Sequence, residues 1–540
     1  MTPLLPLFLL AVGVLTVLVG LVPNFRLTGL IAVGVVLVAF VALVFLGLGL
    51  PVTVTISTWE PLALFPRPLQ LTTDGLSWAF GAVLLLVTLA LFATSLGDDG
   101  QPRVAARLLS LLVTGAALTA LFADNLIAIA ISWTALDALY GLSLAVLGGR
   151  DEIDDTTQIT LGLNVVSSVL VVAAALAAIN DGRAGLLSDD SLPPVAVLLV
   201  VAAGVLRLGV FPFHAALPDK LRLGLAVGAL LRLAPAAVAF ELLARVALLP
   251  GAEALPYAGV LTVLGVIGVV YGAGQWWIAP YPPAGLPFVV LGQSSLALLT
   301  VLWGGALAGV GLAGLGIALL VGAGVLFISN QAQVGAWRIP VVLGVVVLMG
   351  APFTVGYLGL LVLYGGLIAA GWTGWLTLSF VVLGQVLMMA GALRLTFFDS
   401  FEDVLPPEAW VKVGYLFGLG LLITSGVLLG VLPPITARLI AGAAVELPVL
   451  NWGVIALVVG PMVMGGLLWY FEGLVRAAAD RLWDALNDVS RLDWLYRTLI
   501  DGYQLVGRVV AVVAGVIEGE GGVLWTLVAA LLVWLLVTGG

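Results

Sequence analysis

Ionisable side chains interrupt the apolar sequence in a stretch that runs from Leu206 to Pro235. Arg207 and Arg232 lie inside runs that are otherwise apolar, and His214, the only histidine of the chain, lies between them. Two prolines, which lack the backbone donor that a helix needs, flank the histidine. These prolines are Pro212 and Pro218. Because a bilayer accepts buried charge only where it is paired or faces a protein-lined interior, the stretch predicts a charge or proton pathway.

The composition places most of the 540 residues in lipid. Mean hydropathy is +1.24, 62% of the residues are hydrophobic and 9% are charged, which leaves too little polar surface for a soluble chain of this length. The net charge of −9 argues against a nucleic-acid partner. With no cysteine and one histidine, disulfides and thiolate or iron–sulfur sites are excluded, and we expect neither a metal nor a cofactor.

Apolar runs of roughly 18–25 residues, the length that spans a bilayer, predict about sixteen membrane helices. They lie at 3–22, 28–50, 76–97, 104–123, 125–148, 157–180, 193–213, 226–249, 258–279, 284–306, 308–329, 339–370, 373–397, 412–433, 453–471 and 522–539. Residues 51–75 alternate polar and apolar side chains around prolines, which predicts a small extracellular hairpin or loop.

Lysine and arginine outside the predicted helices concentrate in the loops after odd-numbered helices. Loops after even-numbered helices carry only Arg67, Arg183, Arg245 and Arg438. Since basic residues stay on the cytoplasmic side, the asymmetry predicts that both termini lie outside the cytoplasm. We expect a multi-pass protein of the inner (cytoplasmic) membrane.

Two predicted helices contain breaks at corresponding positions. The seventh is interrupted around Pro212, and the twelfth, five helices later, at Pro352 and Gly356. Paired breaks of this kind predict an inverted repeat, with helices 4–8 in one copy and 9–13 in the other. Openings at membrane depth persist only around a polar cavity, which favours a functional role. The alternative, that proline kinks only shape packing, stays open at this point.

The segment 472–521 departs from the membrane-spanning pattern. Its apolar residues recur at near-helical spacing with acidic and basic residues between them, which indicates an amphipathic helix that lies along the interface or against partner subunits. A cytoplasmic amphipathic hairpin fits equally well. The predicted division is 1–103 (N-terminal helices and hairpin), 104–250 (first repeat), 251–400 (second repeat), 401–471 (helices 14 and 15), 472–521 (amphipathic segment) and 522–540 (last transmembrane helix).

These motifs resemble the antiporter-like membrane subunits of respiratory complex I and of multisubunit cation/proton antiporters. The specific match is Phe211–Pro218 (FPFHAALP), which is similar to the family's PFHxWLP motif in helix 7. Supporting matches are Leu71–Ser77, Asp124–Leu126 with Ser132 and Trp133, Gly350–Gly359, and Gly391–Phe401. The resemblance covers about residues 70–400. It implies an all-α polytopic fold with about 14 core helices, broken helices 7 and 12, and buried ionisable residues that carry protons.

The chain departs from the family's pattern at the relay positions. Thr134 stands where the helix 5 acid follows the tryptophan, and Asp137, on nearly the same helix face, is the candidate substitute. Arg207 and Arg232 stand where the family has lysines, and Leu360 stands where helix 12 ends its relay in lysine. The central helices offer only Gln293, Ser294 and Ser295.

These replacements change the expected chemistry, because a buried lysine can release its proton whereas arginine stays charged. The remaining titratable candidates are Asp137, His214 and Glu241. An Asp137–Arg207 pair would serve either in a working half-channel or as an inert structural pair. His214 fits either a pathway mouth or a hydrogen-bonded helix end.

The sequence therefore predicts a membrane subunit of a multisubunit ion-translocating complex, with other membrane subunits and lipid as its partners and a lateral contact through 472–521. It predicts no redox chemistry in this chain, and leaves open whether the chain belongs to a translocase of the NADH–quinone oxidoreductase type. A proton-inert scaffold with a degenerate relay is one alternative. The membrane partner of an inorganic-carbon uptake complex is another.

Overall fold

A computed structural model describes most of the chain in two compact units, Met1–Arg481 and Leu482–Gly540. The described residues are 2–18, 28–57, 69–97, 103–148, 155–183, 185, 187, 192–214, 225–249, 257–329, 338–398, 409–447, 452–476, 497–498, 501–502, 505 and 508. The predicted last helix, 522–539, and most of the amphipathic segment lie outside these residues. The predicted division into six segments stays a prediction.

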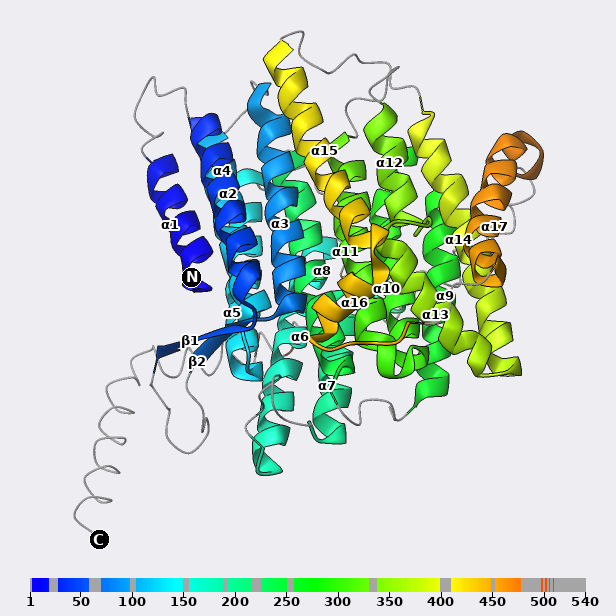
Figure 1. The fold of residues 1–540 in the computed structure, drawn as a ribbon, viewed down its shortest axis with the longest axis horizontal. Helices are drawn as coiled ribbons and strands as arrows, with labels where there is room; N and C mark the ends of the chain where they lie inside the picture. Colours follow the sequence, from blue (N-terminus) through cyan, green and yellow to red (C-terminus); the bar gives the residue numbers. More distant parts are fainter. Residues whose placement is uncertain are drawn as a thin grey trace. The chain divides into compact units, whose positions relative to one another are not determined.

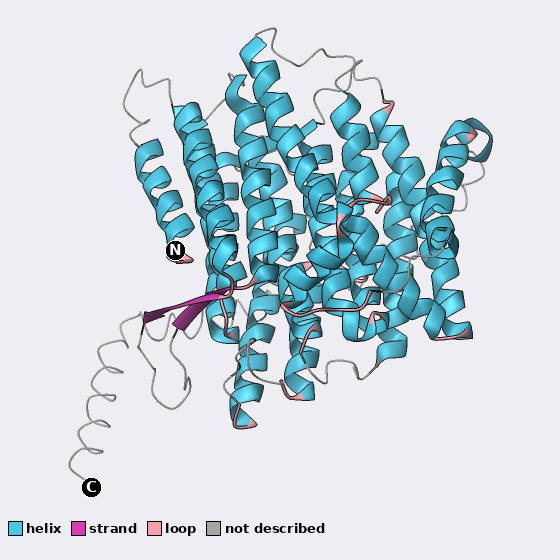
Figure 2. Ribbon diagram, in the orientation of Figure 1, coloured by secondary structure: helices cyan, strands magenta, loops and turns pink. Residues whose placement is uncertain are grey.

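In its described residues the first unit is an all-α membrane protein with one small hairpin (Figures 1 and 2). Its helices are α1 (Leu4–Leu18), α2 (Thr28–Leu46), α3 (Gly75–Thr94), α4 (Arg103–Phe122), α5 (Leu126–Ser143), α6 (Asp155–Asn180), α7 (Pro194–Arg207), α8 (Leu225–Ala247), α9 (Ala258–Ile278), α10 (Leu286–Trp303), α11 (Ala308–Ile328), α12 (Arg338–Leu348), α13 (Val355–Ala369), α14 (Trp372–Thr396), α15 (Ala409–Val431), α16 (Pro433–Ala441) and α17 (Trp452–Tyr470). Short 3₁₀ turns lie at Gly47–Gly49, Ser95–Gly97, Pro282–Gly285 and Gly305–Leu307, and a π turn at Leu144–Gly148.

The described residues include 12 helices long and apolar enough to cross a membrane, and four shorter apolar helices, α1, α7, α12 and α13. Because α12 and α13 are the two halves of one broken span, these helices account for every span predicted up to residue 471. The prediction of a polytopic membrane protein is therefore confirmed. The short helix α16, which begins at a proline immediately after α15, was not predicted.

The segment predicted as a hairpin or loop is a hairpin. Strand β1 (Val52–Ser57) pairs antiparallel with β2 (Leu69–Thr73), with Thr53 opposite Thr72. Asp74 follows β2 and caps α3: its Oδ1 accepts the backbone N–H of Ser77 at 2.8 Å. The hairpin is thus joined to α3 without a free linker.

Helix α11 lies in the core of the helical unit and is buried along its whole length. It packs against α3, α8, α10, α12, α13 and α15. A helix that is apolar on every side needs such surroundings, and small residues allow the approach. At Gly314 an added Cβ would lie 2.7 Å from the backbone nitrogen of Gly359 on α13. The core is therefore closed by backbone contact between these two helices.

The two predicted repeats show the same order of helix contacts. Consecutive helices pack against each other within α4–α8 and within α9–α14, where α12 and α13 together take the place of one helix. In each set the first helix also packs against the last, α4 against α8 and α9 against α14. The repeated contact order agrees with the two five-helix repeats.

Each repeat contains one break with the same backbone conformation. Helix α7 ends at Arg207 and is followed by Gly209 at φ 62°, and α12 ends at Leu348 and is followed by Gly350 at φ 67°. Both glycines therefore occupy the left-handed region that ends a helix. The common geometry places Arg207 and Leu348 at equivalent positions.

Backbone hydrogen bonds close both helix ends in the same way. After α7, the N–H of Val210 donates to the oxygen of Val205 at 3.1 Å, and after α12 the N–H of Ala351 donates to Val346 at 3.1 Å. This six-residue closure is a Schellman motif. The seventh span was predicted to continue to residue 213, which is wrong because the motif already stops the helix at Arg207.

The four residues predicted to form the breaks lie in different places. Pro212 follows the end of α7, and Pro352 lies between α12 and α13. Gly356 belongs to the first turn of α13, where an added Cβ would lie 2.7 Å from the oxygen of Val347. It therefore permits a close helix contact and does not itself interrupt the helix. Pro218 lies outside the described residues.

Candidate functional site

Asp137 of α5 and Arg207 at the end of α7 form a buried ion pair. Arg207 Nη2 lies 2.7 Å from Asp137 Oδ2, and the two side chains are 0% and 6% exposed. The break ends α7 at this residue, so the guanidinium sits at a helix end inside the protein. The structure thus brings together the two residues that the sequence predicted as a pair.

Helix spacing explains why the acid is Asp137 and not the residue after Trp133. Thr134 is exposed, and its hydroxyl donates to Ala130 in its own helix. Trp133 and Asp137, one turn apart, are both buried. The indole of Trp133 lies 4.1 Å from the Arg207 guanidinium carbon, a cation–π contact. Asp137 is therefore the acid that reaches the interior.

Helix α6 supplies the hydroxyl groups that hold the pair. Arg207 Nε donates to Ser167 Oγ at 3.1 Å, and Nη2 donates to Ser168 Oγ at 3.0 Å and to the oxygen of Asn164 at 3.3 Å. Ser168 Oγ in turn donates to Asp137 Oδ2 at 3.0 Å. Neither serine was predicted from the sequence, although the spacing of residues 164, 167 and 168 puts them on one helix face.

Arg232 of α8 lines the same small cavity as Arg207. Its Nη1 donates to Gly228 of the same helix at 3.3 Å, and its guanidinium carbon lies 5.3 Å from the Phe327 ring. The cavity holds about 20 Å³ and is lined by residues of α5, α6, α7, α8 and α10. Arg207 and Arg232 therefore border one space, which reaches α10 of the second repeat at Val290.

His214 packs among aromatic rings. Its ring stacks on Phe211 with 5.7 Å between centroids, and it meets Tyr271 of α9 edge-on at 5.4 Å. The half-buried imidazole thus lies where the break of α7 meets the first helix of the second repeat.

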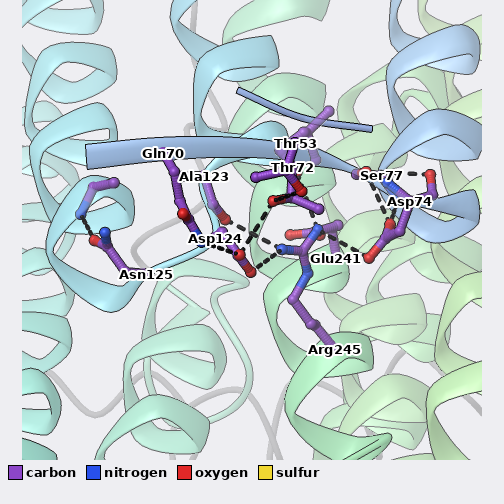
Figure 3. Close-up of polar contacts among 12 residues, drawn as sticks. Thr53, Gln70, Thr72, Asp74, Ser77, Ala123, Asp124, Asn125, Glu241 and Arg245 are labelled. Carbon is purple, nitrogen blue, oxygen red and sulfur yellow. Dashed lines mark hydrogen bonds and ion pairs between the residues drawn. The ribbon is translucent and has the colours of Figure 1, made fainter. Parts of the chain in front are cut away.

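Glu241 belongs to a second group of charges, which we term the Arg245 cluster: Asp74, Asp124, Glu241 and Arg245 (Figure 3). Arg245 Nη2 lies 2.7 Å from Glu241 Oε1 and 3.5 Å from Asp74 Oδ2, and Nη1 lies 3.9 Å from Asp124 Oδ1. Three carboxylates thus surround one guanidinium. Arg245 was predicted to be a loop residue, but it lies in the last turn of α8.

The hairpin and the start of α5 complete this cluster. Gln70 and Thr72 of β2 donate to Asp124 Oδ2 at 2.8 and 3.1 Å. Arg245 also donates to the backbone oxygens of Ala123 and Leu121. The Asp74 side chain is 39% exposed, whereas those of Asp124, Glu241 and Arg245 are nearly fully buried. The cluster therefore leads from the protein surface into its interior.

The second repeat has an uncharged counterpart of the Asp137–Arg207 pair. Gln293 of α10 donates through Nε2 to the oxygen of Leu348, the residue equivalent to Arg207, at 3.2 Å. Leu360 is buried among apolar residues. Between residues 257 and 398 the charged residues that the structure describes are Arg338 and Arg394, both near helix ends. The described core of this repeat thus contains no carboxylate, lysine or histidine.

No family model and no curated protein matches the sequence. Solved structures do match it. A chain of the Mrp complex from Dietzia sp. DQ12-45-1b has a TM-score of 0.76 and 19% identity over 99% of this chain and 62% of that one. A chain of the membrane-bound sulfane sulfur reductase, an archaeal respiratory membrane complex, gives 0.70 and 15% over 98% and 99%. A chain of respiratory complex I from Thermus thermophilus gives 0.62 and 19% over 81% and 100%.

The present chain spans 62% of the length of the matched Mrp chain and nearly the whole length of the other two. At identities of 15–19% the likeness establishes the fold. All three matched chains belong to multisubunit membrane complexes, in agreement with the resemblance found in the sequence motifs. The chain therefore has the fold of the antiporter-like membrane subunits.

Proposed function

We propose that the chain is a proton-translocating membrane subunit of a multisubunit complex, and that its first repeat contains the half-channel. The observation that carries the proposal is the buried Asp137–Arg207 pair at a broken helix, beside a cavity bordered by a second arginine. The likeness to chains of three membrane complexes supports a role among other membrane subunits. We place the complex in the inner membrane, with the termini outside the cytoplasm.

Asp137 is the group that takes up and releases the proton in this scheme. Arg207 keeps its charge, since a guanidinium does not deprotonate in proteins. When Asp137 is protonated, the attraction between the two side chains is lost and Arg207 keeps its hydroxyl contacts to Ser167 and Ser168. The guanidinium is then held less firmly beside α5 and can turn towards the cavity. Arg207 thus serves as a permanently charged partner, and its attraction controls when Asp137 binds a proton.

The Arg245 cluster supplies the mouth of the pathway. Three carboxylates around one arginine carry a surplus of negative charge, which attracts protons. Asp74 opens the cluster to the surface, and α8 connects it to Arg232 over about 20 Å along the helix axis. Glu241 therefore acts at the mouth of the pathway and not beside Asp137.

Proton flux into proteoliposomes that contain the intact complex tests the proposal. Asp137→Asn keeps the size of the side chain but cannot carry a proton, and we expect flux to fall at least about tenfold, in line with the loss of an essential proton carrier. The double variant Asp137→Leu with Arg207→Leu removes the pair without leaving an unpaired charge, and it should fold and also lack flux. The matched control is Asp181→Asn, which removes an exposed ion pair with Arg183 and should keep full flux.

The proton-inert scaffold remains the second candidate because the described core of the second repeat is uncharged. Gln293 and Leu348 fill the equivalent break without any ionisable group. If the double leucine variant assembles and the complex pumps at the wild-type rate, the scaffold is the correct function and the half-channel is not.

A further inference from the structure

We propose that the hydroxyl groups of Thr53 and Thr72 form a proton relay from the exposed side of the β-hairpin to the buried carboxylate of Asp124. In this role the two hydroxyl groups load the mouth of the pathway with protons, so the inference rests on the proposed function. Two hydrogen bonds that follow one another between the surface and Asp124 carry it (Figure 3).

The pairing of the two strands fixes where these hydroxyl groups lie. Thr53 of β1 is directly opposite Thr72 of β2, and residues that face each other across a strand pair extend on the same side of the hairpin. Strand β2 is in turn joined to the residues before α5, because Leu71 forms an antiparallel bridge with Ala123, the neighbour of Asp124. Backbone contacts therefore hold both ends of the relay in place.

Burial increases along this chain of hydroxyl groups, and each hydroxyl hydrogen has one direction. Thr53 is exposed, whereas Thr72 and Asp124 are 6% and 1% exposed. Thr72 Oγ1 lies 3.0 Å from Thr53 Oγ1 and donates to Asp124 Oδ2 at 3.1 Å. Because a threonine hydroxyl has one hydrogen and an ionised carboxylate only accepts, Thr53 is the donor to Thr72. Both hydrogens therefore point inwards, and Thr53 Oγ1 can accept a proton from water at the surface.

Proton uptake along this chain consists of three short transfers. A hydronium ion gives its proton to a lone pair of Thr53 Oγ1 and leaves as water. The former hydroxyl hydrogen of Thr53 passes to Thr72 Oγ1, and the former hydrogen of Thr72 passes to Asp124 Oδ2. Each threonine keeps one hydrogen, and the carboxylate becomes a neutral carboxylic acid. The hydroxyl groups turn back to their first orientation after the acid has released its proton.

Two other polar residues near Asp124 are poorly suited to this step. Gln70 Nε2 donates to the same carboxylate oxygen at 2.8 Å, but a side-chain amide is too weak an acid to hand over its proton. Asp74 is the more exposed acid of the Arg245 cluster, and its Oδ2 lies 3.5 Å from Arg245 Nη2. Since a guanidinium does not deprotonate, Arg245 cannot pass on a proton that Asp74 has bound. The hydroxyl chain therefore connects the surface directly to a buried acid of the cluster.

Proton flux into proteoliposomes that contain the intact complex tests the relay. Thr72→Val keeps the shape of the side chain without its hydroxyl group, and flux should fall about three- to tenfold, with Asp74 left as a slower inlet. Thr72→Ser retains a hydroxyl group and should restore flux to within about twofold of wild type. Gln70→Met also removes one hydrogen bond to Asp124 Oδ2, but it should lower flux much less than Thr72→Val. Equal losses in these two variants would show that the hydrogen bonds only hold Asp124, and would overturn the relay.

A matched pair on β1 provides the second measurement. Thr53→Val should lower flux as Thr72→Val does, whereas Thr55→Val, at an exposed threonine of the same strand, should keep wild-type flux. If Thr72→Val does not assemble, this exposed pair decides. Asp137→Asn separates the two proposals: if it slows flux and the Thr53 and Thr72 valine variants do not, the relay alone is wrong. If Asp137→Asn keeps wild-type flux, the proposed function and the relay are both wrong.

Discussion

The break after α7 and the break after α12 share one backbone conformation, but the first carries charged side chains and the second does not. In both, a glycine in the left-handed region ends the helix with a Schellman motif. At the last helical position the first break has Arg207, held by Asp137, and the second has Leu348, whose oxygen accepts from Gln293. The comparison shows that the break itself needs a glycine and a closing hydrogen bond and does not need charge.

This difference bears on why the first break is charged. A buried ion pair is often no more stable than apolar residues of similar size, because desolvation offsets the attraction. The second break demonstrates, in the same chain, that apolar residues can fill the position. The Asp137–Arg207 pair is therefore not required for the helix to break, which favours a role in ion movement over a role in folding.

The largest expected difference between the two breaks is in the free energy of unfolding that is lost when the polar side chain at each break, Asp137 or Gln293, is removed. Asp137→Leu leaves Arg207 as an uncompensated buried charge, and we expect a loss of about 3–5 kcal/mol in the free energy of unfolding. Gln293→Leu removes a single neutral hydrogen bond and should cost about 1 kcal/mol. Denaturation of both purified variants in the same detergent measures the difference. Equal costs would show that Asp137 and Arg207 do not act as a charged pair.

A smaller contrast is expected from the glycines that end the two helices. Alanine at Gly209 must adopt a left-handed conformation, at a cost of about 1–2 kcal/mol. Alanine at Gly350 carries the same cost, and its Cβ would also lie 2.7 Å from Leu360 Cδ1 and 3.0 Å from the Gly356 backbone. We expect the Gly350→Ala variant to lose about 2–3 kcal/mol.

Melting temperatures of the two alanine variants, measured side by side, check this order. A Gly209→Ala variant less stable than Gly350→Ala would mean that the first break is the more tightly packed of the two. A variant with wild-type stability at either position would show that the left-handed conformation is not needed there.

Features of the fold and site that depend on residues close together in the sequence could be predicted, and features that depend on distant residues could not. Hydropathy predicted every described span, since spans are local apolar runs. Helix spacing also predicted that Asp137 replaces the acid missing at Thr134. The end of α7 at Arg207 was missed because proline suggested a later stop, whereas Gly209 closes the helix earlier.

The Arg245 cluster could not be predicted from sequence patterns. It joins Asp74, Asp124 and the Glu241–Arg245 pair, which come from three separate parts of the chain. Only the four-residue spacing of Glu241 and Arg245 was visible in the sequence, and such pairs are common on helix surfaces. The hairpin register, which brings Gln70 and Thr72 to Asp124, depends on the pairing of β1 with β2 and follows from tertiary structure alone.

The smallest contrast concerns two buried serines, Ser168 of α6 and Ser295 of α10. Ser168 accepts from Arg207 and donates to Asp137, so that Ser168→Ala removes two hydrogen bonds to charged groups, and we expect a loss of about 1.5–3 kcal/mol. Ser295 of α10 is equally buried, but its hydroxyl donates at 2.8 Å to Leu291 within its own helix. Ser295→Ala should therefore change stability by less than about 0.5 kcal/mol, because the Leu291 oxygen keeps its helical hydrogen bond.

Proton flux through the two serine variants provides a second measurement. Ser168→Ala should slow flux as well as lower stability, while Ser295→Ala should do neither. If both serine variants behave alike, the polar face of α6 does not support the ion pair, and the two breaks differ less in energy than their side chains indicate.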